Sequence, residues 1–537
     1  MTIGHASAMD GGRPGSETRD SSSPESRSGI APGSLAGILV FLGIFFAVLM
    51  GGMDALVVNT ALPTIAVDLH QSDGIPFVVG VYLIASTVSI PIFACLSDSM
   101  SRRTIFIGGL LVFITGSMLA GLSQNLSELI AFRAVQGFGI GGLFPVAIAI
   151  VAVLFPPGVR ARMTALLTGA AGISIVAGPL LGSYILDVTT WRWVFYINLP
   201  IGVASLLILV FGVSAMRPAR SLRFDSVGAV LLAGWVAALM FPLVQVSDAG
   251  WAWSDPRVLG LLIAAGVLLA VFLAWEFRNP TPLLPLRLLS RRVVSTTSGV
   301  SLFNGLVLSS ALTFLSVFVG IVLFHGGSNS ANMVRDMIYF FAIPMITGAA
   351  ISAPLLNRFS YRTVIAGGLA LGALSCAFLT DLSTTTSLWV LALGFLPVGG
   401  LVAPLIPMGF GLGLALAGVV IAIQNEAPTE EVGSAVGLVR FFQSLGGAVG
   451  LSLLTAYAAG RISALSASVT SPAGYLDAIV TAYNEVFVAL LAMLVIALGF
   501  ALFLKGRLSS PPASVGQDRR AGSTAGTPVS SPEPPAE

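Results

Sequence analysis

Long apolar stretches separated by short polar segments fill most of the chain. Aspartate, glutamate, lysine and arginine are absent from 74–97, 104–127, 134–159, 163–186, 193–216, 226–247, 258–275, 337–357, 363–380, 441–460 and 486–504. Each stretch can cross the hydrocarbon core of a bilayer, which takes roughly 20 helical residues. The stretches lack the alternation of polar and apolar residues that membrane-spanning strands show. The pattern therefore predicts an all-α polytopic membrane protein.

The basic residues predict which ends of these helices face the cytoplasm. Taken alternately along the chain, the loops fall into two sets. The first set carries Arg102, Arg103, Arg160, Arg162, Arg217, Arg220, Arg223, Arg278, Arg287, Arg291, Arg292, Arg358 and Arg362. The second set carries Arg192, Arg257, Arg335 and Arg461. Because lysine and arginine concentrate in cytoplasmic loops, we expect the first set to face the cytoplasm.

Both termini are expected on the cytoplasmic side. Lys505 and Arg507 follow the last apolar stretch. Charged residues precede the first apolar stretch, and many other apolar stretches follow it. This favours a retained helix over a cleaved signal peptide. Termini on one side require an even number of crossings, and about fourteen helices of roughly 20 residues fit the pattern. The region 382–425 is therefore expected to form one long or broken helix.

Composition excludes a water-soluble globular protein. Hydrophobic residues make up 55% of the chain and charged residues 9%, whereas a soluble domain carries roughly 25% charged residues. The segments 1–33 and 507–537 are rich in serine, proline and glycine and predict disordered cytoplasmic tails. Cys95 and Cys376 lie inside apolar stretches, which favours a packing role over a disulfide or a thiolate metal site.

Two pairs of matching segments indicate an internal duplication. AspSerMetSerArgArg at 98–103 and AsnArgPheSerTyrArg at 357–362 are both short basic turns between apolar stretches. The second pair, with equal spacing, is Gly178 with Gly182 and Gly446 with Gly450. Small residues at such positions let membrane helices approach closely.

The duplication predicts two six-helix bundles plus two additional central helices. We expect an N-terminal bundle at 34–216, a linker with helices 7 and 8 at 217–292, and a C-terminal bundle at 293–506. A substrate route would then lie between the bundles, near the middle of the membrane.

Asp54, in GGMDALVVNTALP, is a candidate for proton coupling or substrate contact, together with Asn59 in the same segment. An ionisable side chain at the centre of a membrane helix costs roughly 2.5 to 3.5 kcal/mol, so it is a functional candidate by default. A carboxyl group can bind and release a proton, which suits coupling. The alternative is a structural carboxylate paired with a polar neighbour.

Arg133 is a second charge inside an apolar stretch, and Gln136 shares its helix face. A guanidinium does not release its proton, so its expected task is to act on a nearby carboxyl group and to hydrogen bond across the bundle. A purely architectural role is the alternative. Arg440 with Gln443 shows the same spacing, and there a structural or cytoplasmic-end position is favoured.

Asp98, Arg102 and Arg103 bound the cytoplasmic end of the second predicted helix. An ion pair there could form in one conformation and break in another, as a latch would. Cytoplasmic anchoring explains the two arginines equally well but leaves Asp98 unexplained.

The fifth predicted helix contains GISIVAGPLLG, with Gly172, Gly178 and Gly182 around Pro179. Proline removes a helix hydrogen bond and permits a bend, and glycines permit close packing. A bendable seam is one interpretation, and simple packing is the other.

The sequence predicts neither catalysis nor a cofactor. It contains no phosphate-binding Walker motif, no histidines at metal-ligand spacing, and no grouped nucleophile, base and orienting residue. Transport would then be driven by an ion or substrate gradient. One proton crossing a potential of about 100 mV supplies roughly 2.3 kcal/mol.

Several segments together resemble the major facilitator superfamily, in particular its fourteen-helix drug:proton antiporter branch of the multidrug and quaternary ammonium efflux type. MDALVVNTALPTIAVDL at 53–69 is similar to the branch's first helix, where the acidic residue is implicated in coupling. LIAFRAVQGFGIGG is similar to its fourth helix, where the residue matching Arg133 is associated with proton transfer. WRWVFYINLPIG at 191–202 resembles the segment that opens its sixth helix.

Two further segments carry the likeness with small departures. ACLSDSMSRRTIF matches the loop after helix 2 at its acidic and basic positions, but has Ala94 and Ser101 where glycines are usual. GISIVAGPLLGS resembles the antiporter motif of helix 5, but has Ser183 where a second glycine is common.

The resemblance implies a major facilitator fold and a proton-coupled antiporter that exports small amphipathic or drug-like molecules by alternating access. Its expected partners are a small-molecule substrate, protons and the lipid bilayer of the cell membrane. We expect a monomer with no cofactor, no metal, no catalytic residue and no nucleic-acid partner. The alternatives are a dedicated exporter of one metabolite, lipid or amino acid, and a membrane scaffold or sensor that transports nothing.

Overall fold

The computed structural model describes most of the membrane region. The described residues are 35–70, 75–212, 224–248, 251–323, 330–383, 401–428, 431–467 and 471–506. The predicted tails, 1–33 and 507–537, lie outside these ranges, as do Arg217, Arg220 and Arg223.

The described chain is built from helices. The first group comprises α1 (Leu35–Asp68), α2 (Ile75–Ser99), α3 (Arg102–Leu122), α4 (Leu126–Gly141), α5 (Leu143–Leu154), α6 (Pro157–Val188), α7 (Trp193–Tyr196) and α8 (Asn198–Gly212). Then come α9 (Ser226–Asp248) and α10 (Pro256–Arg278). The last group comprises η1 (Leu286–Ser290), α11 (Arg292–Val317), η2 (Phe318–Leu323), α12 (Ser330–Arg358), α13 (Tyr361–Phe378), α14 (Val402–Glu426), α15 (Val432–Ser466) and α16 (Pro472–Leu502).

Fourteen stretches of the described chain are helical, long and apolar enough to cross a membrane. Helices α4 and α5 form one of them, α7 and α8 another, and α11 with η2 a third. The all-α class and the number fourteen are thereby confirmed. Part of the predicted helix at 382–425 is the single helix α14, and 384–400 lie outside the described residues.

These segments are helical because a helix satisfies its backbone hydrogen bonds internally, which hydrocarbon requires. The outer surface of helix α10 is apolar, as contact with hydrocarbon also requires. Its residues Ile263, Val267 and Phe277 are exposed on the outer surface of the molecule. A lipid environment accepts such side chains, whereas water would not.

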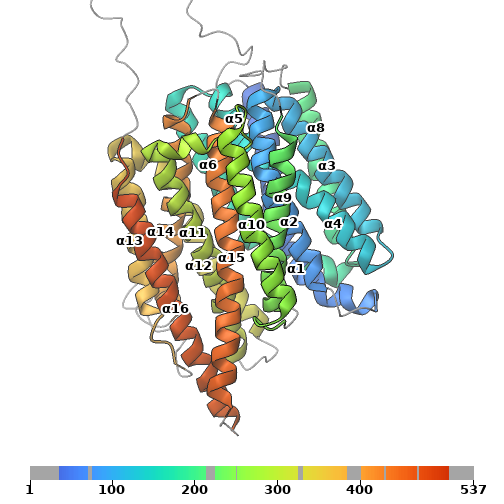
Figure 1. Ribbon diagram of the computed structural model, residues 1–537, viewed down its shortest axis with the longest axis vertical. Helices are drawn as coiled ribbons and strands as arrows, with labels where there is room; N and C mark the ends of the chain where they lie inside the picture. The colour runs from blue at the N-terminus through green and yellow to red at the C-terminus, as the bar shows by residue number, and fades with distance from the viewer. Residues whose placement is uncertain are drawn as a thin grey trace, which may run out of the picture.

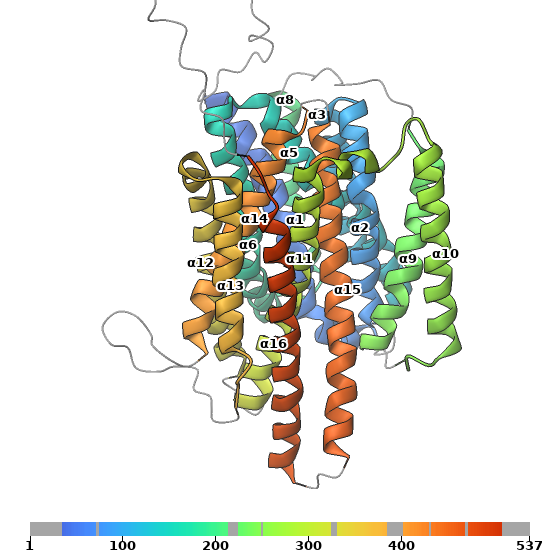
Figure 2. The ribbon, with the colours of Figure 1, turned by 60° about the vertical axis from the view of Figure 1, so that its left-hand side comes forward.

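Two groups of helices lie side by side (Figure 1). Helices α1–α8 form the N-terminal group and α11–α16 the C-terminal group. The pair α9 and α10 is central in the sequence but lies at the side of the molecule, where α9 contacts α2 and α15 (Figure 2). The domain boundaries proposed from the sequence stay a prediction.

The glycines that match between the two halves make equivalent contacts. In each half, the fifth membrane-spanning helix packs against the first, α6 on α1 and α15 on α11. A Cβ added to any of the four glycines would press on that first helix. The partners are Leu56 for Gly178, Thr60 for Gly182, Leu302 for Gly446 and Leu306 for Gly450. The same spacing on both sides is what an internal duplication produces.

Polar side chains join the two groups near the ends predicted to be cytoplasmic. Thr164 on α6 donates a hydrogen bond to Gln424 Oε1 on α14, at 2.6 Å. The amide nitrogen of Gln424 in turn donates to the carbonyl of Ile148, at 3.1 Å. Nearer the middle of the molecule, the hydroxyls of Thr87 and Ser444 lie 2.7 Å apart. These bonds hold the groups together at that side.

The contact between α11 and α15 makes a stability prediction. In Gly446→Ala the new Cβ would meet the backbone of Leu302, and overpacking of this kind costs about 1–3 kcal/mol. The thermal unfolding midpoint of the purified protein should fall. The matched control is Gly460→Ala on the same helix, where a Cβ meets nothing within 4 Å. Because alanine favours a helix over glycine by about 1 kcal/mol, its midpoint should stay or rise. Equal shifts in both variants would contradict the packing argument.

Candidate functional site

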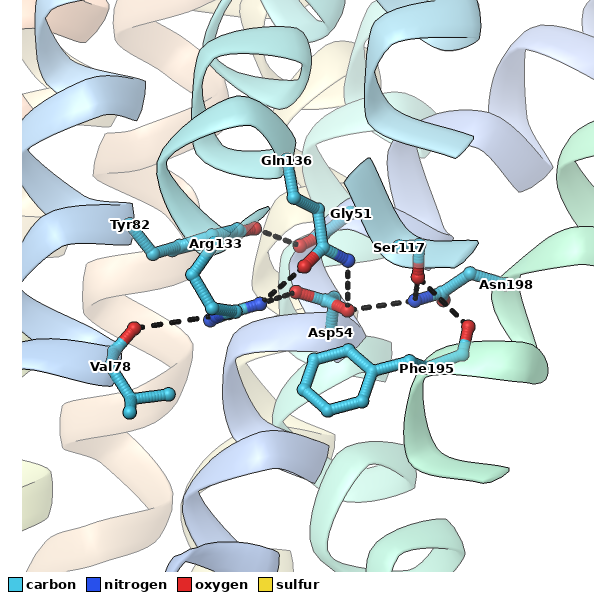
Figure 3. Close-up of polar contacts among 9 residues, drawn as sticks. All are labelled: Gly51, Asp54, Val78, Tyr82, Ser117, Arg133, Gln136, Phe195 and Asn198. Atoms are coloured by element: carbon cyan, nitrogen blue, oxygen red, sulfur yellow. Dashed lines mark hydrogen bonds and ion pairs between the residues drawn. The ribbon is translucent and has the colours of Figure 1, made fainter. Parts of the chain in front are cut away.

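Asp54 and Arg133 form an ion pair inside the N-terminal group (Figure 3). The guanidinium Nη1 of Arg133 on α4 lies 2.6 Å from Oδ2 of Asp54 on α1. Asp54 is 1% exposed and Arg133 is fully buried. The predicted candidates thus meet each other, far from lipid and water.

Neutral polar groups complete the bonding of the Asp54 carboxylate. Its Oδ1 accepts hydrogen bonds from the amides of Gln136, at 2.8 Å, and Asn198, at 2.7 Å. Asn198 also donates to the hydroxyl of Ser117, which donates to the carbonyl of Phe195. Four membrane-spanning stretches therefore contribute to one network, shown in Figure 3.

Arg133 is held on several sides. It donates to Gln136 Oε1 at 2.8 Å and, through Nε, to the carbonyl of Val78 at 3.3 Å. Its guanidinium carbon lies 3.9 Å from the centre of the Tyr82 ring, a cation–π distance. The Nη2 atom is buried and has no hydrogen-bond partner among the described residues. The two N–H donors of Nη2 therefore have no acceptor in this network.

Close helix packing brings these side chains together. A Cβ at Gly137 would meet the backbone of Tyr82 on α2, and one at Gly139 would meet Phe113 on α3. Without these glycines α4 could not approach both neighbours. Arg133 and Gln136 lie three residues apart, on one face of α4. With α4 held close to its neighbours, both side chains reach Asp54 on α1.

A cavity of about 360 Å³ lies between the two helix groups, beside the ion pair. Gly51, Gly52 and Ala55 of α1 line it, as does Tyr82, whose hydroxyl donates to the carbonyl of Gly51 at 3.4 Å. Asp54 itself does not line the cavity. The residues of α1 and Tyr82 that form the cavity wall lie between the cavity and the Asp54 carboxylate. A molecule in the cavity would therefore affect the carboxylate by moving this wall.

Asn59, predicted to act with Asp54, does not join the network. It lies one helical turn beyond Ala55 on the same face of α1 and is exposed. Its side chain has no hydrogen bond to the cluster around Asp54.

The predicted latch divides between two places. Asp98 is buried and accepts hydrogen bonds from the backbone nitrogens of Gly433, at 3.1 Å, and Ser434, at 2.7 Å, in the first turn of α15. Arg102 lies 3.7 Å from Asp98. Arg103 instead donates to the carbonyls at the end of α8, which belongs to its own group. Asp98 therefore contacts the C-terminal group directly, and Arg103 does not.

The helix 5 segment, on α6, contacts both helix groups. Gly178 and Gly182 face α1, whereas a Cβ at Gly172 would meet Ile346 on α12. Pro179 lies inside α6, between these contacts. The segment forms part of the seam between the groups. A bend at Pro179 would therefore change its contacts with α1 in one group and with α12 in the other.

Arg440, for which the sequence favoured a structural or cytoplasmic-end position, lines the cavity. The residue lies two turns inside α15, which begins at Val432. Its Nη1 donates to Gln443 Oε1 at 2.5 Å, and its guanidinium lies 4.8 Å from the Phe144 ring centre. A sequence alone shows a charge in an apolar stretch, but not which face of the helix carries it.

Sequence reasoning missed Asn198 and Tyr82. Asn198 stands in WRWVFYINLPIG, which was noted only for its likeness to a family segment. A polar residue that opens an apolar stretch was the available signal. Tyr82 gave no signal, because an aromatic residue is ordinary in a membrane helix. Among the described residues no group of three His, Cys, Asp or Glu side chains could hold a metal ion.

Comparisons with known proteins agree with this architecture. A family model described as "Major Facilitator Superfamily" matches residues 40–451. The chain is 29% identical to "Multidrug transporter protein MdtP" of Bacillus subtilis (strain 168), over 82% of this chain and 78% of that protein. It is 29% identical to "Multidrug resistance protein 3" of the same organism, over 77% and 78%. The solved human organic anion transporter MFSD10 (TETRAN) has the same fold, with a TM-score of 0.53 at 16% identity over 86% of this chain and 98% of that one.

The ion pair makes a prediction about stability. Asp54→Asn leaves the guanidinium of Arg133 buried without a counter-charge, and breaking a buried pair in this way costs about 3–5 kcal/mol. The double variant Asp54→Asn with Arg133→Gln contains neither charge and should lose less than the sum of the two single variants. Thermal unfolding of the purified variants measures this. Additive losses would show that the two residues are not coupled.

Proposed function

This chain belongs to the Major Facilitator Superfamily, and we propose that it exports small amphipathic or drug-like molecules in exchange for protons. As a member of that family it is a multi-pass membrane transporter. Two relatives carry multidrug names, which favours export of several compounds over one dedicated metabolite. The cell membrane is its proposed location, with both termini in the cytoplasm, and the monomer is its proposed working form.

The buried pair of Asp54 and Arg133, one helix wall away from the cavity, is the observation that carries this proposal. Asp54 is the carboxyl group of that network and can take up a proton, whereas Arg133 keeps its own. A proton on Asp54 would neutralise its carboxylate and remove the ion pair. The guanidinium of Arg133 would then be charged without a counter-charge and could bind other acceptors. Since Gly51 and Ala55 on either side of Asp54 line the cavity, a shift of α1 would change the substrate site.

Alternating access needs a contact that can open and close. The bonds from the first turn of α15 to Asp98 supply one, because a helix N-terminus carries partial positive charge and stabilises a carboxylate. With the Thr164 and Gln424 bond beside it, this contact would keep the cytoplasmic side closed. Substrate entry from the cytoplasm would require both to break.

Transport in everted membrane vesicles tests proton coupling. Wild-type vesicles should accumulate a fluorescent drug when a proton gradient is applied, and Asp54→Asn should reduce this to the level of vesicles without the protein. The matched control is Asp477→Asn, which removes an exposed carboxylate on α16 and should behave as wild type. Amounts of protein in the vesicles are compared first, because the variant is also expected to be less stable. Accumulation by Asp54→Asn against a gradient at the wild-type rate would refute coupling through this residue.

Distance measurements test the cytoplasmic contact. Spin labels at positions 162 on α6 and 362 on α13, both exposed, would report the separation of the two groups. Asp98→Asn removes the charge that α15 binds, and loss of a charged hydrogen bond, worth about 1.5–3 kcal/mol, should raise the open population about tenfold or more. Arg103→Gln changes contacts inside one group only and should leave the distances unchanged. Identical distance distributions in Asp98→Asn and wild type would contradict the latch.

A further inference from the structure

Among the described residues that line the cavity between the helix groups, one has a charged side chain, Arg440. The other lining residues are apolar or neutral, among them Ser309, Gln443 and Ser444. A charge in an apolar site within the membrane is costly and needs a partner. The chemistry of the molecule that enters is therefore constrained by this residue.

Arg440 has no carboxylate partner among the described residues. Its contacts there are the hydrogen bond to Gln443 and the stacking on Phe144. Arg133, which is buried in the N-terminal group, is by contrast neutralised by Asp54 at 2.6 Å. A guanidinium presents five N–H donors, so most of those on Arg440 remain for a ligand.

A cationic molecule finds no complementary group at this site. No aspartate or glutamate of the described chain lines the cavity, and the nearby Asp54 lies behind the wall and is already bonded. The two aromatic rings in the lining, Tyr82 and Phe144, each already have a guanidinium over them, from Arg133 and Arg440. A bound cation would have no counter-charge and would be repelled by Arg440.

We propose that the molecules this protein exports carry an anionic group, such as a carboxylate or phenolate, on an apolar aromatic body, and that Arg440 binds the anion. This rests on the proposed function and names its substrate class. Arginine binds planar oxyanions through two parallel hydrogen bonds. The aliphatic wall of α1 and α11, including Ala55 and Leu308, would receive the apolar body. A cavity of about 360 Å³ suits one small molecule of drug size.

A matched set of fluorescent probes tests the proposal. Pyrenebutyrate, its uncharged methyl ester and pyrenebutylamine share one aromatic body and differ in charge at neutral pH. Binding of each to the purified full-length protein in lipid nanodiscs is measured by fluorescence anisotropy. The wild type should bind the carboxylate more tightly than the ester, and the amine most weakly. Arg440→Gln should weaken carboxylate binding about tenfold to a hundredfold, as loss of a charge-assisted hydrogen bond predicts, without weakening the ester equally.

Two further variants separate recognition from general effects. Arg440→Lys keeps the charge and should retain part of the preference for the carboxylate. Arg287→Gln removes an exposed positive charge on η1, outside the cavity, and should bind all three probes as wild type does. The wild-type ranking of the probes tests the preference for an anion even if Arg440→Gln fails to fold, and Arg440→Lys then tests the role of this residue.

The outcomes for anion recognition and for export are distinct. The proposal is overturned if the wild type binds the amine as tightly as the carboxylate, if the carboxylate does not bind, or if a folded Arg440→Gln binds the carboxylate unchanged. Export of other compounds by proton-loaded vesicles would then still support the proposed function. If the carboxylate binds through Arg440 but no proton gradient drives its accumulation in everted vesicles, anion recognition stands and the proposed antiport fails.

Discussion

The ion pair between Asp54 and Arg133 constrains the N-terminal half of the structure. A charge held away from water costs several kcal/mol, and this cost is offset only when partners meet with good geometry. Gln136, Asn198 and the Tyr82 ring supply that geometry from α4, α8 and α2. The helices must keep their register for the pair to survive, which explains why glycines, and no larger residues, stand where α4 crosses α2 and α3.

Arg133 and Arg440 have opposite environments. Arg133 is buried and paired with Asp54. Arg440 faces the cavity, where it contacts Gln443 and the ring of Phe144. One charge is thereby part of the framework and the other is presented to whatever enters. If protons act at Asp54 and substrate at Arg440, the two would communicate through α1 and Tyr82, which form the wall between them, without sharing a binding group.

The link between the helix groups combines helix packing, of α6 on α12 and α15 on α2, with hydrogen bonds. Inside each group, glycines on the fifth spanning helix let it lie directly on the first. Between the groups, hydrogen bonds from Asp98 and Thr164 lie at the predicted cytoplasmic side, and the bond between Thr87 and Ser444 lies nearer the middle. Bonds of this kind, each worth about 0.5–3 kcal/mol, can be exchanged for others far more readily than a packed helix face. A rocking motion would have to exchange these bonds and slide α6 on α12 and α15 on α2.

The sequence by itself determined the fold class, the fourteen spans and the repeated glycines. Hydrocarbon requires apolar helices, and each apolar stretch can be recognised from its own residues. The sequence also picked out Asp54, Arg133, Gln136 and Asp98, because a polar or charged group in an apolar stretch is conspicuous. Only the tertiary structure decided which of them meet. The partners of Asn59, Arg103 and Arg440 could not be predicted, because the direction of a side chain depends on helix rotation and packing. Asn198 and Tyr82 became visible only as partners, since a contact between residues far apart in the chain has no local signature.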